Sequence, residues 1–185
     1  MKKVLIICAH PDLESSVANK AIIDELQKQL PDAEFDLLGE LYPHYKIDVQ
    51  KEQEKLSRTD IIVFQTPIFW YNVPSLLRKW FEDVLTFGFA YGPMGTALAG
   101  KKVICSLTTG SPVEAYRYDG AQVHTIDEYI VGIKQLVCLC GMEWNGYIQT
   151  GGVSYETREN EIVRKDIIQK CIRHAHELTE KIAQL

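Results

Sequence analysis

The feature that most constrains the fold is the segment at residues 61–66, which opens with an unbroken apolar run of mostly β-branched side chains. A strand that is covered on both faces needs such a run, because neither face meets water. Pro74 suits the first turn of a helix, so it marks where the next helix begins. The segment therefore predicts a buried strand, then a loop, then a helix.

The loop between this strand and this helix carries three consecutive large aromatic residues, Phe69, Trp70 and Tyr71. A connection of ordinary composition would carry glycine, asparagine, serine or aspartate. Two interpretations are open at this point. Either a flat ligand lies against the rings, or the rings cap the sheet as part of the core or of an interface.

Similar apolar runs and helical patterns alternate along the rest of the chain. We predict strands at residues 3–9, 33–38, 61–66, 102–107 and 142–150, the last interrupted at Asn145 and Gly146. Helices are predicted after Ser15 or Ser16 as far as Leu30, and at residues 49–57, 74–85, 126–141 and 157–185. This alternation predicts an α/β fold, a doubly wound five-stranded parallel sheet of order 2-1-3-4-5 with helices on both faces.

Composition bounds the class of protein. The 185 residues, 46% hydrophobic and 24% charged, suit a single globular domain over residues 1–185. A formal charge of -5 offers no basic surface for a polyanion, so we predict no nucleic-acid partner. The cysteine pattern predicts reduced, buried thiols in a cytoplasmic protein. Cys171 and His174 lie one helical turn apart, but two ligands without a third predict surface or packing residues rather than a metal site, and we predict no metal.

In doubly wound sheets, ligands bind at the carboxyl ends of the strands, where the strand order reverses. Residues 10–19, 67–73 and 108–111 follow the first, third and fourth strands at that edge. Residues 16–19 open a helix whose unpaired N–H groups suit a phosphate, although a plain N-cap by serine is the alternative. His10 either hydrogen-bonds such a phosphate or ties down the loop.

The loop after the fourth strand is small and polar, with Thr108, Thr109, Gly110 and Ser111. Its backbone can approach a flat ring closely, and its hydroxyl and N–H groups can hydrogen-bond the edge of that ring. A phosphate site, an aromatic loop and a small polar loop at one edge describe a site for a phosphorylated planar heterocycle. Flavin mononucleotide (FMN) meets this description.

Several short motifs within residues 3–141 resemble those of one protein family. They are His10-Pro11, Ser16-x-Ala18-Asn19, Leu41-Tyr42-Pro43 with Ile47-Asp48, Glu52-Gln53, Pro67-x-x-Trp70-Tyr71-x-x-Pro74-x-Leu76-Leu77-x-x-Trp80, Gly88-Phe89-Ala90-Tyr91-Gly92, Leu98-x-Gly100-Lys101 and Thr108-Thr109-Gly110. In these motifs the chain resembles the NAD(P)H:quinone oxidoreductase family of flavodoxin-like flavoproteins. Within that family it is most similar to the ancillary flavoproteins of glutathione-regulated potassium-efflux antiporters.

The resemblance implies a bound FMN, or FAD as in some relatives. The implied contacts are His10, Ser16, Val17, Ala18 and Asn19 around the phosphate and ribityl chain, Pro67, Ile68, Phe69, Trp70 and Tyr71 along the isoalloxazine, and Thr108, Thr109, Gly110 and Ser111 at the pyrimidine edge. The resemblance also implies a homodimer with its active site at the subunit interface. The implied reaction is two-electron hydride transfer from NAD(P)H through the flavin to a quinone or similar electrophile.

In relatives, a tyrosine and a histidine placed after the Thr-Thr-Gly loop stabilise charge or relay a proton when the flavin is reduced. Tyr116 has the family distance from Gly110, whereas Tyr118 has the family spacing to His124, so both tyrosines are candidates. The second glycine of the family motif is Ser111 here, and Pro112 follows it. This loop is therefore expected to be stiffer or shifted.

Phe87, Phe89 and Tyr91 would wall the active-site slot, including that of a partner subunit, or lie buried at the dimer interface. A second function also follows from the resemblance, that of a regulatory flavin-binding subunit with little or no catalytic role. Such a subunit would dock on a potassium-efflux antiporter at the cytosolic face of the inner membrane. A one-electron flavodoxin is less favoured, because these loops carry aromatic and hydroxyl groups instead of an acidic docking surface.

Overall fold

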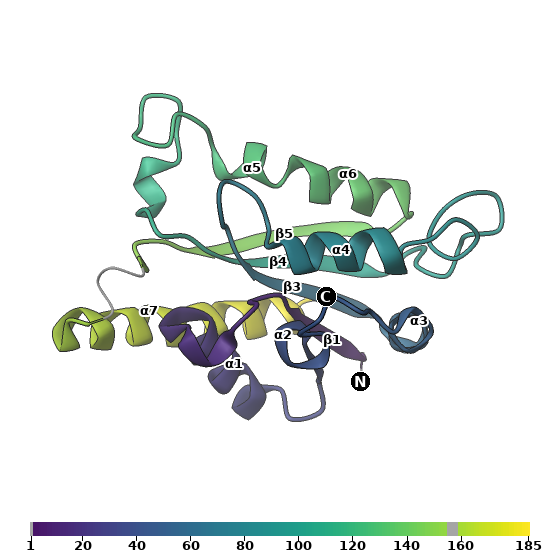
Figure 1. Cartoon of the computed structure of the whole chain (residues 1–185), viewed down its shortest axis with the longest axis horizontal. Coiled ribbons are helices and arrows are strands. Elements are labelled where there is room, and N and C mark those ends of the chain that lie inside the picture. The colour runs from purple at the N-terminus through teal and green to yellow at the C-terminus, as the bar shows by residue number, and fades with distance from the viewer. Residues whose placement is uncertain (1, 155–158) are drawn as a thin grey trace.

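Five parallel strands form one sheet in the order β2-β1-β3-β4-β5 in the computed structural model, which describes residues 2–154 and 159–185 (Figure 1). The strands are β1 (Val4–Cys8), β2 (Glu34–Leu37), β3 (Ile61–Pro67), β4 (Lys102–Thr108) and β5 (Glu143–Thr150). The predicted flavodoxin-like sheet and its strand order are confirmed. Each predicted strand is present, with its ends within one residue of the expected position.

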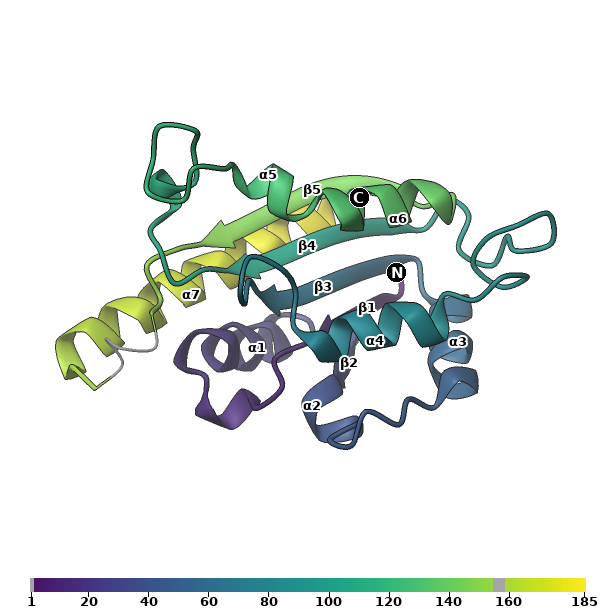
Figure 2. The ribbon, with the colours of Figure 1, turned by 45° about the horizontal axis from the view of Figure 1, so that its top comes forward.

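Helices cover both faces of the sheet (Figure 2). One face carries α1 (Val17–Gln29) and α7 (Glu161–Ala183), and the other carries α2 (Leu38–Leu41), α3 (Val49–Arg58), α4 (Ser75–Val84), α5 (Ile126–Tyr129) and α6 (Val131–Leu139). Two short 3-10 helices, η1 (Leu13–Ser15) and η2 (Val113–Ala115), lie in the connections. The two helical layers leave the strand ends accessible at the edge where the site is predicted.

Successive side chains of each strand point to opposite faces of the sheet. In β1, Leu5 and Ile7 join the core beneath α4, whereas Ile6 and Cys8 join the core beneath α1 and α7. Because both faces are covered, every residue of β3 is buried, as its apolar run predicts.

Three local features differ from the prediction. The helix expected at residues 126–141 is broken at Ile130, whose φ of -105° and ψ of 9° end α5 before α6 begins. Ile130, Val131 and Gly132 follow one another, and all three have weak helix propensity. Pro74 is the N-cap of α4 instead of a first-turn residue. Cys138 is exposed instead of buried, because it lies on the side of α6 that faces away from the core.

The interruption expected in the fifth strand is confirmed. The pairing of β4 with β5 shifts register between Val103 and Cys105, and Gly146 has a φ of +85°, a value that favours glycine. α7 begins at Glu161 behind the N-cap Asn160. The start that we predicted at residue 157 lies outside the described residues.

α3 carries a feature that its polar sequence conceals, a buried charged cluster. Nζ of Lys55 donates to Oε1 of Glu52 at 2.6 Å and to Oδ1 of Asp36 at 2.6 Å. Glu52 also accepts the hydroxyl of Tyr42 at 2.7 Å and the indole N–H of Trp80 at 2.8 Å. Burial alone would raise the pKa of Glu52, but the hydrogen bonds from these three donors outweigh it and hold the pKa below its ordinary value. Glu52 is thus the acceptor that ties α3 to α4 and to the segment after α2.

Candidate functional site

The loops after β1, β3 and β4 meet in one cleft of about 410 Å³ at the carboxyl ends of these strands. The predicted binding residues that line it are His10, Ser16, Val17, Ala18, Asn19, Pro67, Ile68, Phe69, Thr108, Thr109 and Gly110. Trp70, Tyr71 and Ser111 do not line it, and neither do the three catalytic candidates. The residues that line the cleft and the residues that lie outside it are held by different turns and loops.

The end of the cleft at α1 suits an anion. Ser16 is the N-cap of α1, and its Oγ accepts the backbone N–H of Asn19 at 3.1 Å. The N–H groups of Val17 and Ala18 in the first turn have no acceptor within the helix, and the helix dipole is positive at this end. The N-cap is therefore confirmed, and it leaves backbone donors for a ligand.

His10 supports the loop after β1. Its Nδ1 accepts the backbone N–H of Asp12 at 3.2 Å, so the neutral ring carries its hydrogen on Nε2. Burial lowers the pKa of His10 below its ordinary value. The ring meets Phe69 edge-on, with 5.5 Å between the ring centroids. His10 thus ties down the loop, one of the two interpretations, and Nε2–H is the remaining donor of the ring.

The loop after β3 closes as a tight turn with strained backbone. Phe69 and Asn72 exchange two backbone hydrogen bonds, of 2.8 and 3.0 Å, and between them Trp70 and Tyr71 have φ values of +47° and +64°. Two positive φ values fit a type I′ turn, which glycine and asparagine favour and bulky residues do not. Such strain is typical of ligand-binding loops. The turn holds Phe69 in the cleft and leaves Trp70 93% exposed.

Tyr129, a residue that the sequence interpretation missed, gathers several aromatic side chains beside the cleft. Its ring stacks on Tyr71 at 5.6 Å between centroids and meets Tyr116 at 5.9 Å and His124 at 6.1 Å, both edge-on. We call Tyr71, Tyr116, His124 and Tyr129 the Tyr129 cluster. Tyr116 belongs to it, whereas Tyr118 is 70% exposed. The structure therefore separates the two tyrosines that the spacing alone left equal.

Ser111 fixes the loop after β4 by accepting two hydrogen bonds outside the cleft. The hydroxyl of Thr109 donates to the carbonyl oxygen of Ser111 at 3.0 Å, and Nε2 of Gln122 donates to Oγ of Ser111 at 2.8 Å. Gly110 is exposed and lines the cleft. Ser111 therefore shapes the loop, while Gly110 presents backbone to the cleft.

Three residues of the lining come from segments that we did not assign to the site, Val153 and Ser154 after β5 and Ile167 of α7. A signal for the first two exists in the glycines that directly follow β5. A Cβ on Gly151 would lie 2.8 Å from the carbonyl oxygen of Ser111, so the two loops approach closely there. Ile167 has no such signal, because α7 reaches the cleft only by packing beside α1.

Buried polar side chains link the cleft to α7. Oδ1 of Asn19 accepts from Nε2 of Gln65 at 2.9 Å, and Oε1 of Gln65 accepts the hydroxyl of Ser106. Oγ of Ser106 lies 2.5 Å from Nε2 of His174, and Nδ1 of His174 lies 2.8 Å from Oγ1 of Thr150. All five side chains are buried. We call this set the buried polar chain.

The position of His174 predicts a loss of stability in acid. Burial lowers its pKa from 6.5 to about 4, so below pH 6.5 the unfolded chain binds a proton that the folded chain does not. Between pH 7 and pH 4, the free energy of unfolding of the wild type should therefore fall by about 3 kcal/mol more than that of the variant His174→Gln. Urea unfolding of both proteins at the two pH values measures this difference.

The comparison with the variant is needed because Asp36 acts in the opposite sense. Burial raises the pKa of Asp36 to about 6, so its contribution to stability increases as the pH falls through this range. That contribution is common to both proteins and cancels in the difference. An equal acid loss in the wild type and the variant would contradict the role given to His174.

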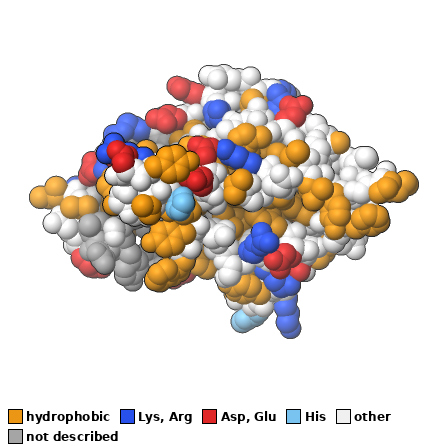
Figure 3. All heavy atoms as spheres, turned by 90° about the horizontal axis from the view of Figure 1, so that it is seen from above, with side chains coloured by type: hydrophobic (Ala, Val, Ile, Leu, Met, Phe, Trp, Pro, Cys, Tyr) orange, Lys and Arg blue, Asp and Glu red, His pale blue; other side chains and the backbone are white. Residues whose placement is uncertain are grey.

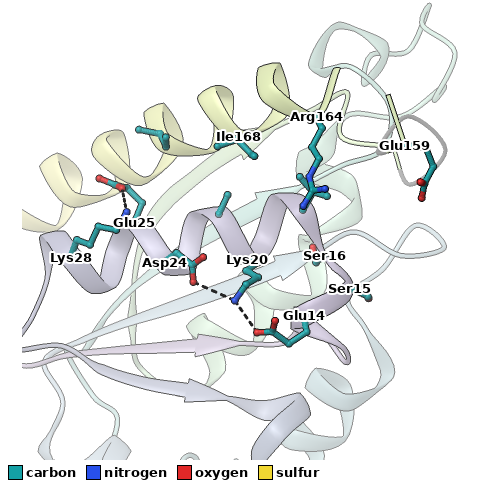
Figure 4. A pocket seen from close by; sticks show the side chains of 13 residues that line it. Glu14, Ser15, Ser16, Lys20, Asp24, Glu25, Lys28, Glu159, Arg164 and Ile168 are labelled. Atoms are coloured by element: carbon teal, nitrogen blue, oxygen red, sulfur yellow. Dashed lines mark hydrogen bonds and ion pairs between the residues drawn. The ribbon is translucent and has the colours of Figure 1, made fainter. Parts of the chain in front are cut away.

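A second cleft, of about 430 Å³, lies between α1 and α7 and adjoins the first at residues 15–17. Figure 4 shows Lys20 between Glu14 and Asp24, with Arg164 reaching from α7 toward α1. Nζ of Lys20 lies 2.8 Å from a carboxylate oxygen of Glu14 and 3.7 Å from one of Asp24. The lining of this cleft holds four carboxylates and three cations, so it suits an anion less well than the start of α1 does.

Within residues 2–154 and 159–185, no group of three or more His, Cys, Asp or Glu side chains is arranged to hold a metal ion. Cys171 and His174 are both buried, which excludes the surface alternative. Cys171 packs in the core beneath α1 and α7, whereas His174 hydrogen-bonds within the buried polar chain. No helix in the described part of the chain is long and apolar enough to cross a membrane.

Comparison with known proteins places the chain in a family. Residues 2–174 match the Flavodoxin_2 family, described as having a flavodoxin-like fold. The chain is 44% identical to the "Uncharacterized NAD(P)H oxidoreductase YrkL" of Bacillus subtilis, over 77% of this chain and 81% of that protein. It is 40% identical to the "Glutathione-regulated potassium-efflux system ancillary protein KefG" of Cronobacter sakazakii, over 77% of each chain.

A solved structure adds to these relatives. General stress protein 14 of Treponema denticola, in complex with FMN, matches this structure with a TM-score of 0.86 at 28% identity, over 98% of this chain and 99% of that one. The fold, the strand order and the family match all indicate a flavodoxin-like protein. The chain therefore belongs to the Flavodoxin_2 family of proteins with a flavodoxin-like fold.

Proposed function

We propose that this protein is an FMN-dependent NAD(P)H:quinone oxidoreductase. The observation that carries the proposal is the single cleft that joins a helix N-terminus, the strained β3 loop and the polar β4 loop. Two relatives support it, since YrkL is named an NAD(P)H oxidoreductase and the Treponema denticola protein was solved with FMN. The choice of a quinone as acceptor rests on the resemblance of the sequence motifs.

The groups along the cleft fit FMN from end to end. A phosphate at the start of α1 would meet the N–H groups of Val17 and Ala18 and the hydroxyl of Ser16. The flat ring would lie against residues 67–69, with its polar edge toward residues 108–110. The volume of about 410 Å³ is that of an ordinary small-molecule site.

Electrostatics favour FMN over FAD. The cleft between α1 and α7 adjoins the phosphate end and is the space open to the additional nucleotide half of FAD. Its four carboxylates outnumber its three cations, and Lys20 is already paired with Glu14, so a second phosphate would meet net negative charge. Chromatography of the flavin released from the purified protein identifies which of the two is bound.

When bound, FMN supplies the redox chemistry, a hydride accepted from NAD(P)H and then passed, with a proton, to a quinone that becomes a quinol. The residues of this chain have other tasks. The Tyr129 cluster would exclude water beside the ring and hold flat substrates. The hydroxyl of Tyr116 and the imidazole of His124 would hold and move the proton. His124 is oriented by Glu128, whose Oε1 lies 3.4 Å from its Nδ1.

The proposal is tested by anaerobic addition of NADH or NADPH to the FMN-loaded protein. We expect the visible absorbance of the flavin to disappear, and to return when a soluble quinone such as menadione is added. Steady oxidation of NAD(P)H should then depend on the quinone. A flavin that stays oxidised under an excess of both nucleotides would rule out this enzyme activity.

The two candidate tyrosines provide a matched pair of variants. We expect Tyr116→Phe to lower kcat/KM for quinone reduction by about 100-fold or more, since a proton-transferring side chain typically contributes about 10²- to 10⁴-fold. Tyr118→Phe should stay near the wild-type value, because Tyr118 is 70% exposed and outside the Tyr129 cluster. Steady-state kinetics of both variants measures the difference. A large loss in Tyr118→Phe alone would reverse the assignment.

We further propose that the protein acts as a homodimer. Residues 86–100 lie at the opposite end of the sheet from the cleft (Figures 1 and 2), so Phe87 cannot line the cleft of its own chain. Phe87 and Met94 are 70% and 83% exposed, and hydrophobic side chains gather at both ends of the face over α5 and α6 (Figure 3). Exposed apolar surface of this kind is typical of subunit interfaces. Light scattering that gives a monomer at all working concentrations would contradict the dimer.

A second candidate function is that of an ancillary subunit of a potassium-efflux antiporter, held at the cytosolic face of the inner membrane by that partner. The observation in its favour is the 40% identity to the Cronobacter sakazakii protein, which carries such a name. Co-purification with an antiporter would support this function. Unchanged potassium efflux in a deletion strain would count against it, and the enzyme activity is compatible with either result.

A further inference from the structure

We propose that His174 is a positioning residue for the phosphate end of the cleft, acting through the buried polar chain on the hydroxyl of Ser16. The inference rests on the proposed binding of FMN and deepens it. It assigns a task to a residue of α7 that does not line the cleft and that the proposed reaction does not use.

The direction of the hydrogen bonds at α7 fixes one tautomer of His174. Ser106 has a single hydroxyl hydrogen and donates it to Oε1 of Gln65, so its Oγ can only accept from Nε2 of His174. His174 therefore carries its hydrogen on Nε2. Its Nδ1 accepts the hydroxyl hydrogen of Thr150 at 2.8 Å. A neutral imidazole, with one donor and one acceptor nitrogen, satisfies both neighbours.

The same direction continues to the cleft. Nε2 of Gln65 donates to Oδ1 of Asn19 at 2.9 Å, and Nδ2 of Asn19 donates to Oγ of Ser16 at 3.1 Å. Oγ of Ser16 also accepts the backbone N–H of Asn19 at 3.1 Å. Both lone pairs of Ser16 thus accept hydrogens from within the protein. Its own hydroxyl hydrogen is left to donate to an anion in the cleft.

The other tautomer would reverse the buried polar chain. With the hydrogen on Nδ1, Ser106 would have to donate to Nε2, and the side-chain amides of Gln65 and Asn19 would turn over. Ser16 would then donate its hydrogen to Asn19 and present only a lone pair to a phosphate. Because His174 is 2% exposed and buried hydrogen bonds polarise one another, water does not compensate for the wrong direction.

The test compares FMN with riboflavin, which has the same ring and ribityl chain but no phosphate. Dissociation constants for the apoprotein are measured by quenching of flavin fluorescence. We expect His174→Leu to weaken FMN binding about tenfold and to leave riboflavin binding nearly unchanged. When Ser16 is already replaced by alanine, His174→Leu should not alter the ratio of the FMN and riboflavin dissociation constants any further.

Leu178→Ala is the matched control for lost packing. Leu178 is fully buried, lies one turn after His174 on α7 and belongs to the hydrophobic core beneath α1 and α7. This variant should be destabilised and still keep the wild-type ratio of the two constants. Equal weakening of both flavins by His174→Leu, or the same change of ratio in Leu178→Ala, overturns the inference while FMN binding by the wild type stands. A wild type that binds neither flavin refutes the proposed function, and the inference with it.

A measurement on the wild type removes any dependence on how the variants fold. The nitrogen chemical shifts of the His174 imidazole report which nitrogen carries the hydrogen. With FMN bound, we expect hydrogen on Nε2 and a bare Nδ1. A hydrogen on Nδ1 would overturn the inference.

Discussion

Glu52→Gln is expected to lower the free energy of unfolding by about 3–5 kcal/mol, the range for breaking a buried ion pair by neutralising one partner. Glutamine has nearly the shape of glutamate, so the core volume is kept. Lys55 would lose one of its two anionic partners, at 2.6 Å, while it stays buried. The new amide N–H₂ would also face Tyr42 or Trp80, which are themselves donors. Urea unfolding followed by tryptophan fluorescence measures the loss.

Glu54→Gln is the matched control on the same helix. Glu54 is exposed, and its side chain accepts only from Gln50 at 2.9 Å among the hydrogen bonds of the described residues. Its replacement should change stability by less than about 0.5 kcal/mol. Similar losses in both variants would mean that the charged cluster does not stabilise the fold as described.

Asn19→Leu is expected to weaken FMN binding about 100-fold and to destabilise the protein by about 2–4 kcal/mol, because it leaves two buried donors without an acceptor. Oδ1 of Asn19 accepts from Gln65 of β3 at 2.9 Å and from Thr108 of β4 at 3.2 Å. Asn19 itself lies in the first turn of α1. One side chain therefore joins the start of α1 to β3 and β4 just before their loops enter the cleft. Calorimetric titration with FMN measures the affinity.

Ile22→Ala separates loss of stability from loss of the site. Ile22 lies one turn further along α1, is fully buried and belongs to the hydrophobic core beneath α1 and α7. Its truncation should destabilise the fold by about 2–5 kcal/mol, yet FMN affinity should stay within a few-fold of the wild type. If Ile22→Ala weakens FMN as much as Asn19→Leu does, the joining role of Asn19 is wrong.

The fold could be predicted from the sequence because its three central strands, β1, β3 and β4, are buried on both faces. Residues 61–64 and 103–105 are unbroken apolar runs that an amphipathic helix would not show, and the alternation with helices leaves few topologies. The meeting of three loops at one edge follows from the parallel sheet. The N-cap at Ser16 follows from its side chain.

The contacts that join distant parts of the chain were not predictable in the same way. Glu52 and Lys55 look like solvent-facing charges on a polar helix, since their partners Asp36 and Trp80 are far away in sequence. His174 lies 68 residues after Ser106, and nothing local shows that they touch. Tyr129 gathers rings from two loops only because α5 packs beside the β3 loop. Such contacts depend on packing, which residue patterns do not encode locally.

The central claim is that the cleft at the ends of β1, β3 and β4 holds the flavin. The most direct test is a crystal structure of the protein grown with FMN. We predict the phosphate at the start of α1, beside Ser16 and Asn19, and the ring between residues 67–69 and 108–110. Flavin bound instead in the cleft between α1 and α7, or a protein that crystallises without flavin from saturating FMN, would contradict the account.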